Sequence, residues 1–339
     1  MNILLFGGKS LEHEISIITA YQIKDYLNDC RLIYINKDGD MLLADRLSLE
    51  DFKNNRLSGL KKIWFYKGGF KTKFKSYRIN CAIIALHGKN GEDGAVKGLL
   101  NMYDIPSVGP DVLPSAIFMN KAISHELLKN KGFKVTNYYL LNRTDFVFTR
   151  YQNTYPCIIK PNNGGSSIGV YVCYNDADFT INARRAFELC NEIIVEEYLS
   201  QIEEYNVAVA NGYLSNAYMI NNKGDYFSFA DKYDNLEKVN VIVKNNDLAV
   251  ELKNIALKIY KEFNLSGIVR VDFLVKENDI YVCELNTIPG GLANYMFDDF
   301  AKVINSEIEK AIVSLYKEKR LNNSKLNLFN ISKFSKYQG

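Results

Sequence analysis

The sequence lacks several of the residue patterns that identify common protein classes. Its 339 residues contain only three histidines, which disfavours a histidine-based metal site. Its six cysteines show no Cys-x-x-Cys spacing, so no zinc-ribbon or dithiol redox motif is present. No apolar run approaches a membrane span, which needs about 18 residues, and no secretory leader is recognisable. We therefore expect a soluble cytoplasmic protein whose cysteines are free thiols.

The charge balance is nearly even and gives no sign of a polyanionic partner. The 42 basic and 39 acidic residues leave a net charge of +3, which is too small to indicate nucleic acid binding. Hydrophobic residues make up 47% of the chain and charged residues 24%, as in ordinary globular proteins. The length predicts two or three packed units of about 100 to 150 residues each.

Strands and helices alternate in the first part of the chain, which indicates an α/β fold. Hydrophobic periodicity predicts strands at residues 2–6, 31–35, 62–66 and 80–86, and a helix over 14–27. A parallel sheet with crossover helices is the simplest architecture for this pattern. Pro106 and Pro110 then interrupt the chain, and we place a domain boundary there.

Helical and strand patterns also follow one another in the rest of the chain. Residues 221–246 form a long polar segment, and connections of this length are usually lids or binding loops. The remaining predicted elements are helices at 113–119, 121–131, 177–190, 248–263 and 297–316, strands at 155–160, 169–174 and 192–198, and a hairpin over 204–220.

A hairpin near the C-terminal end brings four polar side chains together. If its turn centres on Asn278, Asp272 lies opposite Glu284 and Arg270 lies opposite Asn286. Side chains alternate along a strand, so all four share one face, and two facing carboxylates repel one another. A hard cation such as Mg²⁺ would relieve that repulsion through carboxylate and amide oxygens. The alternative interpretation is a solvated hairpin whose polar residues happen to align.

A second pattern points to phosphate binding. Lys160 ends a predicted strand and precedes a turn that contains Gly164, Gly165, Ser166 and Ser167. Such a turn offers a cation and backbone N–H groups to a polyanion. The lysine comes first and the chain returns to a strand, so a phosphate-covering hairpin fits better than a P-loop. The alternative is a flexible connection without a ligand.

The turn after the first strand carries a carboxylate where open sheets place ligands. Gly7 and Gly8 lack the spacing of a dinucleotide fingerprint, so Glu12 is the informative residue there. For His13 and His87 we expect hydrogen-bonded structural roles rather than catalytic ones.

Taken in order, these motifs resemble the D-Ala-D-Ala ligases of the ATP-grasp superfamily. The resemblance extends from Met1 to about residue 315 and rests on GGKSLEHEISI, ALHGKNGEDGAVKGLL, SVGPDVLPSAIFMNK, IIKPNNGGSSIGV, VEEYL with EEYNVAV, DKY, IVRVDF and CELNTIPGG. It implies an ATP-grasp fold in four segments. These are a Rossmann-like domain (1–108), a central α+β subdomain with the phosphate loop (109–193), a mixed-sheet domain with metal site and lid (194–318), and a polar basic tail (319–339).

The resemblance also implies a role for each matching residue. The residues matching metal ligands, for probably two Mg²⁺ (or Mn²⁺) ions in the family, are Asp272, Glu284 and Asn286. The residues matching ATP contacts are Lys121, Lys160, Ser167, Glu197, Leu199, Glu204 and Lys232. The residues matching the catalytic group are Glu12, Ser166 and Tyr233, which link the first D-alanine to the loop and lid, and Arg270 and Gly290 near the reacting carbonyl.

The activity implied is ligation of two D-alanines through an acyl phosphate, in peptidoglycan precursor synthesis, by a homodimer. The sequence departs from the family after Pro289, where many relatives carry Thr-Ser-x-Ser and this chain places Tyr295. The second substrate therefore stays open, and the alternative is a ligase that joins D-alanine to another small D-amino or D-hydroxy acid, or a different dipeptide ligase. A nucleotide-binding protein without turnover is the third hypothesis, although Arg270, both carboxylates and the two phosphate lysines argue against it.

Overall fold

The computed structural model describes residues 1–146, 153–220, 241–243 and 246–323. The N-terminal lobe is built on a six-stranded sheet in the order β4-β3-β2-β1-β8-β9. Its strands are β1 (Asn2–Gly7), β2 (Cys30–Ile35), β3 (Met41–Leu43), β4 (Lys61–Lys62), β8 (Ala82–Ile84) and β9 (Ser107–Val108). The helices of this lobe are α1 (His13–Ile23), η1 (Lys24–Tyr26), α2 (Leu49–Lys53) and α3 (Ala95–Met102). The centre of the sheet is parallel, as predicted.

The edge of this sheet differs from the prediction. Strands β3 and β4 run antiparallel, because the connection from Ile35 to Met41 is too short for a crossover. The predicted strand 62–66 is also divided. Its second half is β5 (Trp64–Tyr66), which pairs with β6 (Gly69–Lys71) and β7 (Ser76–Arg78) in a separate three-stranded sheet.

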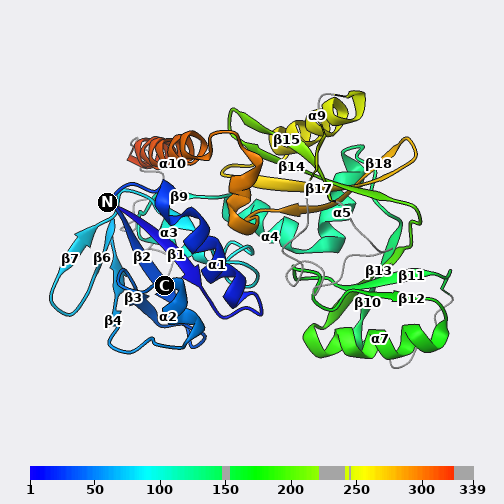
Figure 1. Cartoon of the computed structure of the whole chain (residues 1–339), viewed down its shortest axis with the longest axis horizontal. Helices are drawn as coiled ribbons and strands as arrows, with labels where there is room; N and C mark the ends of the chain where they lie inside the picture. The colour runs from blue at the N-terminus through cyan, green and yellow to red at the C-terminus, as the bar shows by residue number, and fades with distance from the viewer. Residues whose placement is uncertain (147–152, 221–240, 244–245, 324–339) are drawn as a thin grey trace, which may run out of the picture.

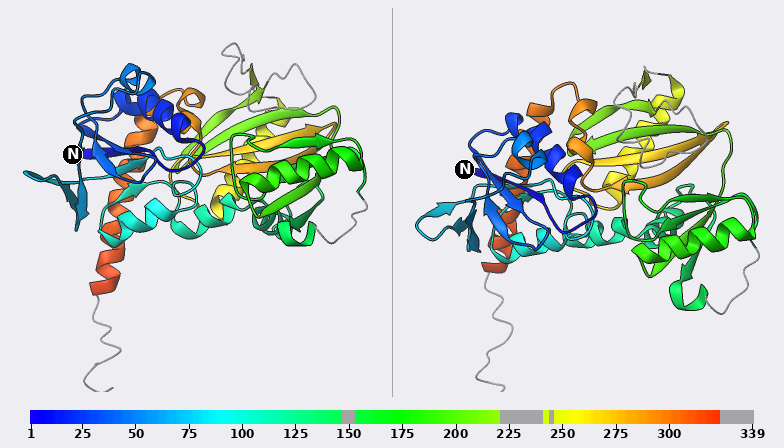
Figure 2. Two further views of the ribbon diagram at one scale, coloured as in Figure 1. Left: turned by 90° about the horizontal axis from the view of Figure 1, so that it is seen from below. Right: turned by 60° about the horizontal axis from the view of Figure 1, so that its bottom comes forward.

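The last helix returns to the first lobe. Helix α10 (Phe300–Asn323) lies beside the N-terminal sheet in Figures 1 and 2. Phe300, Val303 and Ile304 are buried in the same hydrophobic core as β1. The start of the predicted tail, residues 319–323, continues this helix. The four-segment division stays a prediction, but the N-terminal core draws on both ends of the chain.

A four-stranded antiparallel sheet in the order β10-β13-β11-β12 forms the second unit. Its elements are β10 (Tyr138–Asn142), α6 (Arg143–Phe146), β11 (Cys157–Pro161), β12 (Tyr171–Cys173), α7 (Asp176–Leu189) and β13 (Glu192–Glu197). Asn175 caps the start of helix α7, and its side chain accepts from the N–H of Asp178 at 3.0 Å. It covers one face of the sheet (Figure 1), where Ile159 and Phe187 are buried together. The opposite face is thereby left for Lys160, which lies one residue from Ile159.

The third unit is a five-stranded sheet in the order β16-β15-β14-β17-β18. Its strands are β14 (Glu203–Ala210), β15 (Tyr213–Ile220), β16 (Val241–Val243), β17 (Val269–Lys276) and β18 (Asp279–Asn286). The helices α4 (Val112–Met119), α5 (Lys121–Asn130) and α9 (Asp247–Glu262) accompany it, and η2 (Gly290–Met296) follows it. Val271, Phe273 and Leu285 are buried in its core, so this face of the predicted hairpin points inward as expected. None of the helices in the described ranges is long and apolar enough to span a bilayer.

Candidate active site

The hairpin of β17 and β18 has the predicted pairing at its polar positions. Arg270 lies opposite Asn286, and Asp272 lies opposite Glu284. The turn is tighter than a turn centred on Asn278, because Lys276 pairs directly with Asp279. An irregularity in the pairing between Asp272 and Phe273 adds one residue to β18 and restores the predicted register. The prediction is therefore confirmed for the four polar residues, and the bulge is the feature that produces it.

The two facing carboxylates are each paired with a cation of the chain. The guanidinium of Arg270 donates to both oxygens of Asp272, at 2.6 and 2.7 Å. Burial opposes the charge of Arg270, but the carboxylate of Asp272 outweighs it and raises the guanidinium pKa above its ordinary value. Asn286 also donates to Asp272 at 2.9 Å, and Asn206, with its amide oriented to donate, lies 3.0 Å away. These contacts fix the orientation of Asp272.

Lys121 joins the hairpin to the glycine-rich loop. Its Nζ lies 3.4 Å from Glu284 Oε1 and donates to the carbonyl oxygen of Gly164 at 2.5 Å. Lys121 is the first residue of α5, whose preceding Asn120 caps the helix by accepting from Ile123 N at 3.0 Å. The cap therefore sets the direction in which Lys121 leaves the helix. Lys121 and Glu284, which are 163 positions apart in the sequence, therefore lie side by side.

Lys160 is held by a buried carboxylate that the sequence analysis missed. Its Nζ donates to Glu196 Oε2 at 2.8 Å, and Thr136 donates to the same oxygen at 3.2 Å. The ring Nε2 of His125 lies 3.8 Å from Glu196 Oε1. Burial would raise the pKa of Glu196, but the charge of Lys160 outweighs it and holds that pKa below its ordinary value of 4.5. Glu196 therefore positions Lys160.

The adjacent glutamate, which was predicted to contact ATP, points away from Lys160. Successive side chains on β13 alternate between faces, and Glu197 accepts from Asn137 N at 2.8 Å and from its amide at 3.1 Å. Leu199 is buried with an exposed fraction of 7%. Neither Glu197 nor Leu199 lines the cavity described below.

The glycine-rich loop contacts the first lobe directly. Ser166 donates to the carboxylate of Glu12, and a Cβ at Gly165 would lie only 3.1 Å from Glu12 Oε1. Ser166 and Ser167 have positive φ values of 54° and 56°, a conformation that is unfavourable for residues with side chains. Burial raises the pKa of Glu12 and Glu92 raises it further, whereas the hydrogen bond from Ser166 lowers it. The loop therefore adopts a strained backbone conformation where it meets the turn after β1.

The two histidines singled out from the sequence are hydrogen-bonded. His13 lies 2.5 Å from the oxygen of Gly8 and 3.1 Å from the hydroxyl of Tyr34, and it is buried as a structural residue. His87 Nε2 lies 2.8 Å from Thr19 Oγ1, and its Nδ1 lies 3.2 Å from Glu92. Unlike His13, His87 also lines the cavity.

The segment after Pro289 turns in a way that the sequence did not predict. Gly291, Leu292 and Ala293 have positive φ values of 57°, 47° and 53°, so three consecutive residues are left-handed. The N–H of Gly291 donates to Thr19 at 3.0 Å and ties the turn to α1. Tyr295 lines the cavity, and its carbonyl oxygen accepts from Tyr218 at 3.1 Å.

One cavity of about 540 Å³ collects most of the predicted site residues. It lies where the N-terminal lobe, the four-stranded sheet, the five-stranded sheet and the turn after Pro289 meet. The predicted residues that line it are Glu12, Lys121, Lys160, Ser166, Ser167, Glu204, Arg270, Asp272, Glu284, Asn286 and Gly290. Lys232 and Tyr233 lie outside the described residues.

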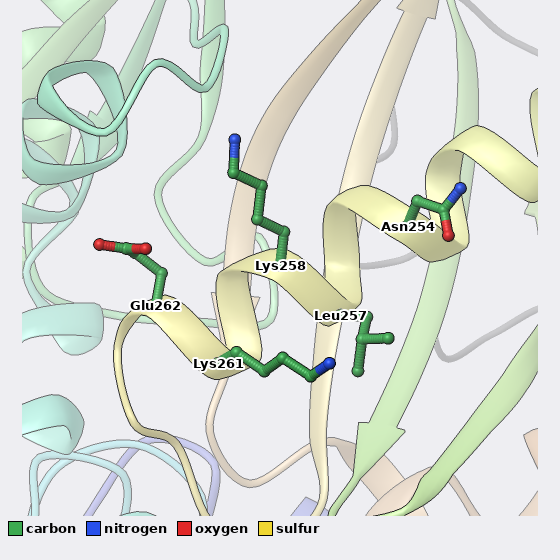
Figure 3. Close-up of a pocket in the computed structure, with 5 residues that line it drawn as sticks. All are labelled: Asn254, Leu257, Lys258, Lys261 and Glu262. Carbon is green, nitrogen blue, oxygen red and sulfur yellow. The ribbon is translucent and has the colours of Figure 1, made fainter.

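A second hollow of about 390 Å³ lies on α9 and contains no comparable chemistry. It is lined by Asn254, Leu257, Lys258, Lys261 and Glu262 (Figure 3). Lys131 pairs with Glu262 at 2.6 Å, and Lys258 lies over the ring of Phe133. This hollow is therefore an ordinary charged helix surface.

The oxygen donors of the hairpin suit a hard divalent cation. In the described part of the chain, no three His, Cys, Asp or Glu side chains gather to hold a metal ion. Asp272, Glu284 and the amide of Asn286 nevertheless present oxygens from one end of one hairpin. Carboxylate and amide oxygens that leave positions for water and phosphate are the ligands Mg²⁺ takes in nucleotide sites, so the donor set fits.

Comparison with known proteins places the chain in one family. Residues 2–110 match the model of the D-Ala-D-Ala ligase N-terminus, and residues 127–316 match that of its C-terminus. A D-alanine–D-alanine ligase from Nitratiruptor sp. is 34% identical, over 89% of this chain and 91% of that protein.

Solved structures agree over nearly the full length. The D-Ala-D-Ala ligase from Helicobacter pylori has a TM-score of 0.77 at 29% identity, covering 91% of this chain and 98% of its own. The VanG D-Ala:D-Ser ligase from Enterococcus faecalis has a TM-score of 0.75 at 26% identity, covering 93% and 98%. The expected α/β, ATP-grasp fold is confirmed. The chain belongs to the D-Ala-D-Ala ligase family.

Proposed function

We propose that the chain joins two D-alanines into D-alanyl-D-alanine with ATP, through an acyl phosphate, in peptidoglycan precursor synthesis. The observation that carries this proposal is one cavity lined by Lys121, which contacts a carboxylate of the β17–β18 hairpin, by Lys160, and by Glu12 from the first lobe. Two cations, which suit a polyphosphate, and a carboxylate, which suits an ammonium group, line one volume and support the proposal.

In this proposal Asp272, Glu284 and Asn286 hold Mg²⁺ or Mn²⁺, two ions in total. When bound, the ions neutralise phosphate charge so that one anion is able to attack another. Arg270 and Lys121 take up part of the carboxylate charge at the hairpin.

The nucleotide is held by the remaining polar groups. Lys121 binds the phosphates when it turns from Gly164, Lys160 binds them while it stays paired with Glu196, and Ser167 and Lys232 assist them. Glu204 binds the ribose hydroxyls, and Glu197 and Leu199 contact the adenine. Glu196 orients Lys160, because it holds the lysine from the buried side.

The amino-acid substrates are bound between the first lobe and the hairpin. Glu12, oriented by Ser166, accepts the ammonium group of the first D-alanine, and Tyr233 completes this set. The guanidinium of Arg270 and the backbone at Gly290 stabilise the oxyanion that forms when the second amine attacks. The glycine-rich loop excludes water, which would otherwise hydrolyse an acyl phosphate.

A second substrate other than D-alanine is the main alternative. Tyr295 stands where many relatives carry the serine motif, and the similar VanG enzyme is named a D-Ala:D-Ser ligase. The cavity wall at Tyr295 is therefore the region that decides between D-alanine, D-serine and a D-hydroxy acid. We further propose that the enzyme is a cytoplasmic homodimer.

One assay tests the proposed function. Purified protein is mixed with ATP, Mg²⁺ and a panel of D-amino and D-hydroxy acids, and both ADP release and product mass are recorded. Formation of D-alanyl-D-alanine from D-alanine alone supports the proposal. Product formation only with a different second acid supports the alternative, and ADP release without a condensed product contradicts both.

A further inference from the structure

Two cysteines face one another at the base of the glycine-rich hairpin. Cys157 on β11 and Cys173 on β12 are direct partners in the antiparallel register. Opposed residues in such a pair have Cα atoms about 4.5 to 5.5 Å apart, within the range that a disulfide spans. The two thiols also hydrogen-bond to one another. No other paired cysteines occur in the strand registers of the described residues.

The electrostatic environment makes one of these thiols the better nucleophile. The hydrogen bond from Cys157 lowers the pKa of Cys173, whose sulfur also accepts from Asn182 at 3.7 Å. The same hydrogen bond, together with burial, raises the pKa of Cys157. Cys173 is therefore the more acidic thiol of the pair, and Cys157 is placed to resolve it.

The cysteine pair lies at the stem of the loop, on the face of the sheet that points away from the cavity. Cys157 and Ile159 are buried against α7, whereas Lys160 lines the cavity on the other face. Strand β12 is a three-residue edge strand, and residues 162–170 between the two strands form the loop that contacts Glu12. A bond between the cysteines would close the stem of this loop without entering the substrate site.

We propose that Cys157 and Cys173 form a reversible thiol–disulfide pair that closes the stem of the glycine-rich loop, with a peroxide as oxidant. The Cys173 thiol gives up its proton and its sulfur attacks a peroxide oxygen; the O–O bond breaks to give a sulfenic acid and hydroxide, and the hydroxide takes up that proton as water. Cys157 loses its proton and attacks the sulfenic sulfur, so that an S–S bond forms and a second water leaves. The sum is two thiols and one hydrogen peroxide giving one disulfide and two waters.

Both thiols are buried, with exposed fractions of 3% and 0%, so the oxidant reaches them when β12 separates from β11. Once formed, the bond holds the edge strand in place and restricts the loop that carries Ser166. Loops of this kind open and close in each catalytic cycle, so the oxidised protein should turn over several-fold more slowly. This last step rests on the proposed function, whereas formation of the bond does not.

The folded protein is treated with hydrogen peroxide, the remaining thiols are blocked, and peptides are mapped by mass spectrometry before and after reduction. We expect a cross-linked peptide pair carrying Cys157 and Cys173, two hydrogens lighter than the reduced pair and released by dithiothreitol. Cys173 recovered unmodified, or as a sulfinic acid without a cross-link, overturns the proposal. This readout needs no activity, so its failure is distinct from failure of the proposed function.

Turnover is measured on the same samples, with matched variants as controls. Cys157→Ala should abolish both the cross-link and the loss of turnover under peroxide, whereas Cys30→Ala, remote in β2, should change neither. Cys283 lines the cavity and faces no cysteine across β17, so it should form no cross-link with either cysteine of the pair. If Cys157→Ala still loses turnover under peroxide, the disulfide is not the cause of that loss, and its proposed effect on turnover is overturned.

Discussion

Asp272 and Glu284 face one another across β17 and β18, and each carboxylate is paired with a cation. The two cations come from two different elements. Asp272 is held by Arg270 on its own strand at 2.6 Å, and Glu284 lies 3.4 Å from Lys121 at the start of α5. Two opposed carboxylates are thereby kept in register, as the proposed metal site requires.

Glu284→Gln should abolish turnover while the fold stays intact. The amide keeps the shape of the side chain but removes the negative charge that binds the cation. Steady-state ADP release at saturating Mg²⁺ measures the effect, and thermal unfolding checks the fold. Asp279→Asn is the matched control, because Asp279 lies at the turn of the same hairpin and pairs with Lys134 at 2.7 Å. Equal rates for the parent and Glu284→Gln would refute the proposed metal role.

Arg270→Ala should lower kcat by on the order of a hundredfold or more, which corresponds to about 3 kcal/mol of transition-state stabilisation. In the proposed mechanism, the guanidinium provides a preorganised cation where the oxyanion forms. Arg31→Ala is the control, since Arg31 makes a similar 2.6 Å pair with Asp45 in the N-terminal sheet. A variant that raises KM but keeps kcat would show that Arg270 binds substrate rather than the transition state.

The sequence predicted the polar register of the hairpin because alternation and a short turn are local properties. It could not predict the irregularity between Asp272 and Phe273, which adds one residue to β18. Alternation also predicts that Glu196 and Glu197 point in opposite directions, but not which of them points inward. That choice depends on Lys160, His125 and Thr136, which come from other parts of the chain.

Contacts between residues far apart in the sequence could not be predicted from local patterns either. Motif order placed Lys121 and Glu284 in one site, yet their contact spans 163 residues and no local pattern contains it. The left-handed turn from Gly291 to Ala293 is another case. Leucine and alanine do not favour positive φ, so only packing against α1 and the hydrogen bond to Thr19 explain it.

Lys160→Met should destabilise the protein by about 3 to 5 kcal/mol, because the buried carboxylate of Glu196 would lose its lysine and keep only the weaker contacts with Thr136 and His125. Glu196 has an exposed fraction of only 2%. Urea unfolding of the single variant and of Lys160→Met with Glu196→Leu tests this, since the double variant should regain most of the loss. If the single variant unfolds at the urea concentration of the parent, the pair contributes no stability.

The same pair predicts a loss of stability in acid. The pKa of Glu196 in the folded state lies below its ordinary value of 4.5, so the unfolded chain takes up the proton first. The stabilisation is therefore complete above that value and is lost as the pH falls through the lower, folded pKa. Urea midpoints measured from pH 6 to pH 3 should fall less steeply for Glu196→Gln than for the parent. Parallel curves would rule out a contribution from Glu196.

Gly165→Ala should raise the KM for D-alanine and leave the stability of the fold nearly unchanged. The added Cβ would lie 3.1 Å from Glu12 Oε1, so the carboxylate or the loop must shift by a few tenths of an ångström. Gly98→Ala is the matched control. Its Cβ would lie an ordinary 3.6 Å from Val112, and alanine within α3 should stabilise the protein by about 0.5 to 1 kcal/mol. Substrate titrations of both variants separate the two effects, because only the change beside Glu12 should alter KM. An unchanged KM in Gly165→Ala would mean that the loop and Glu12 separate before the amino acid binds.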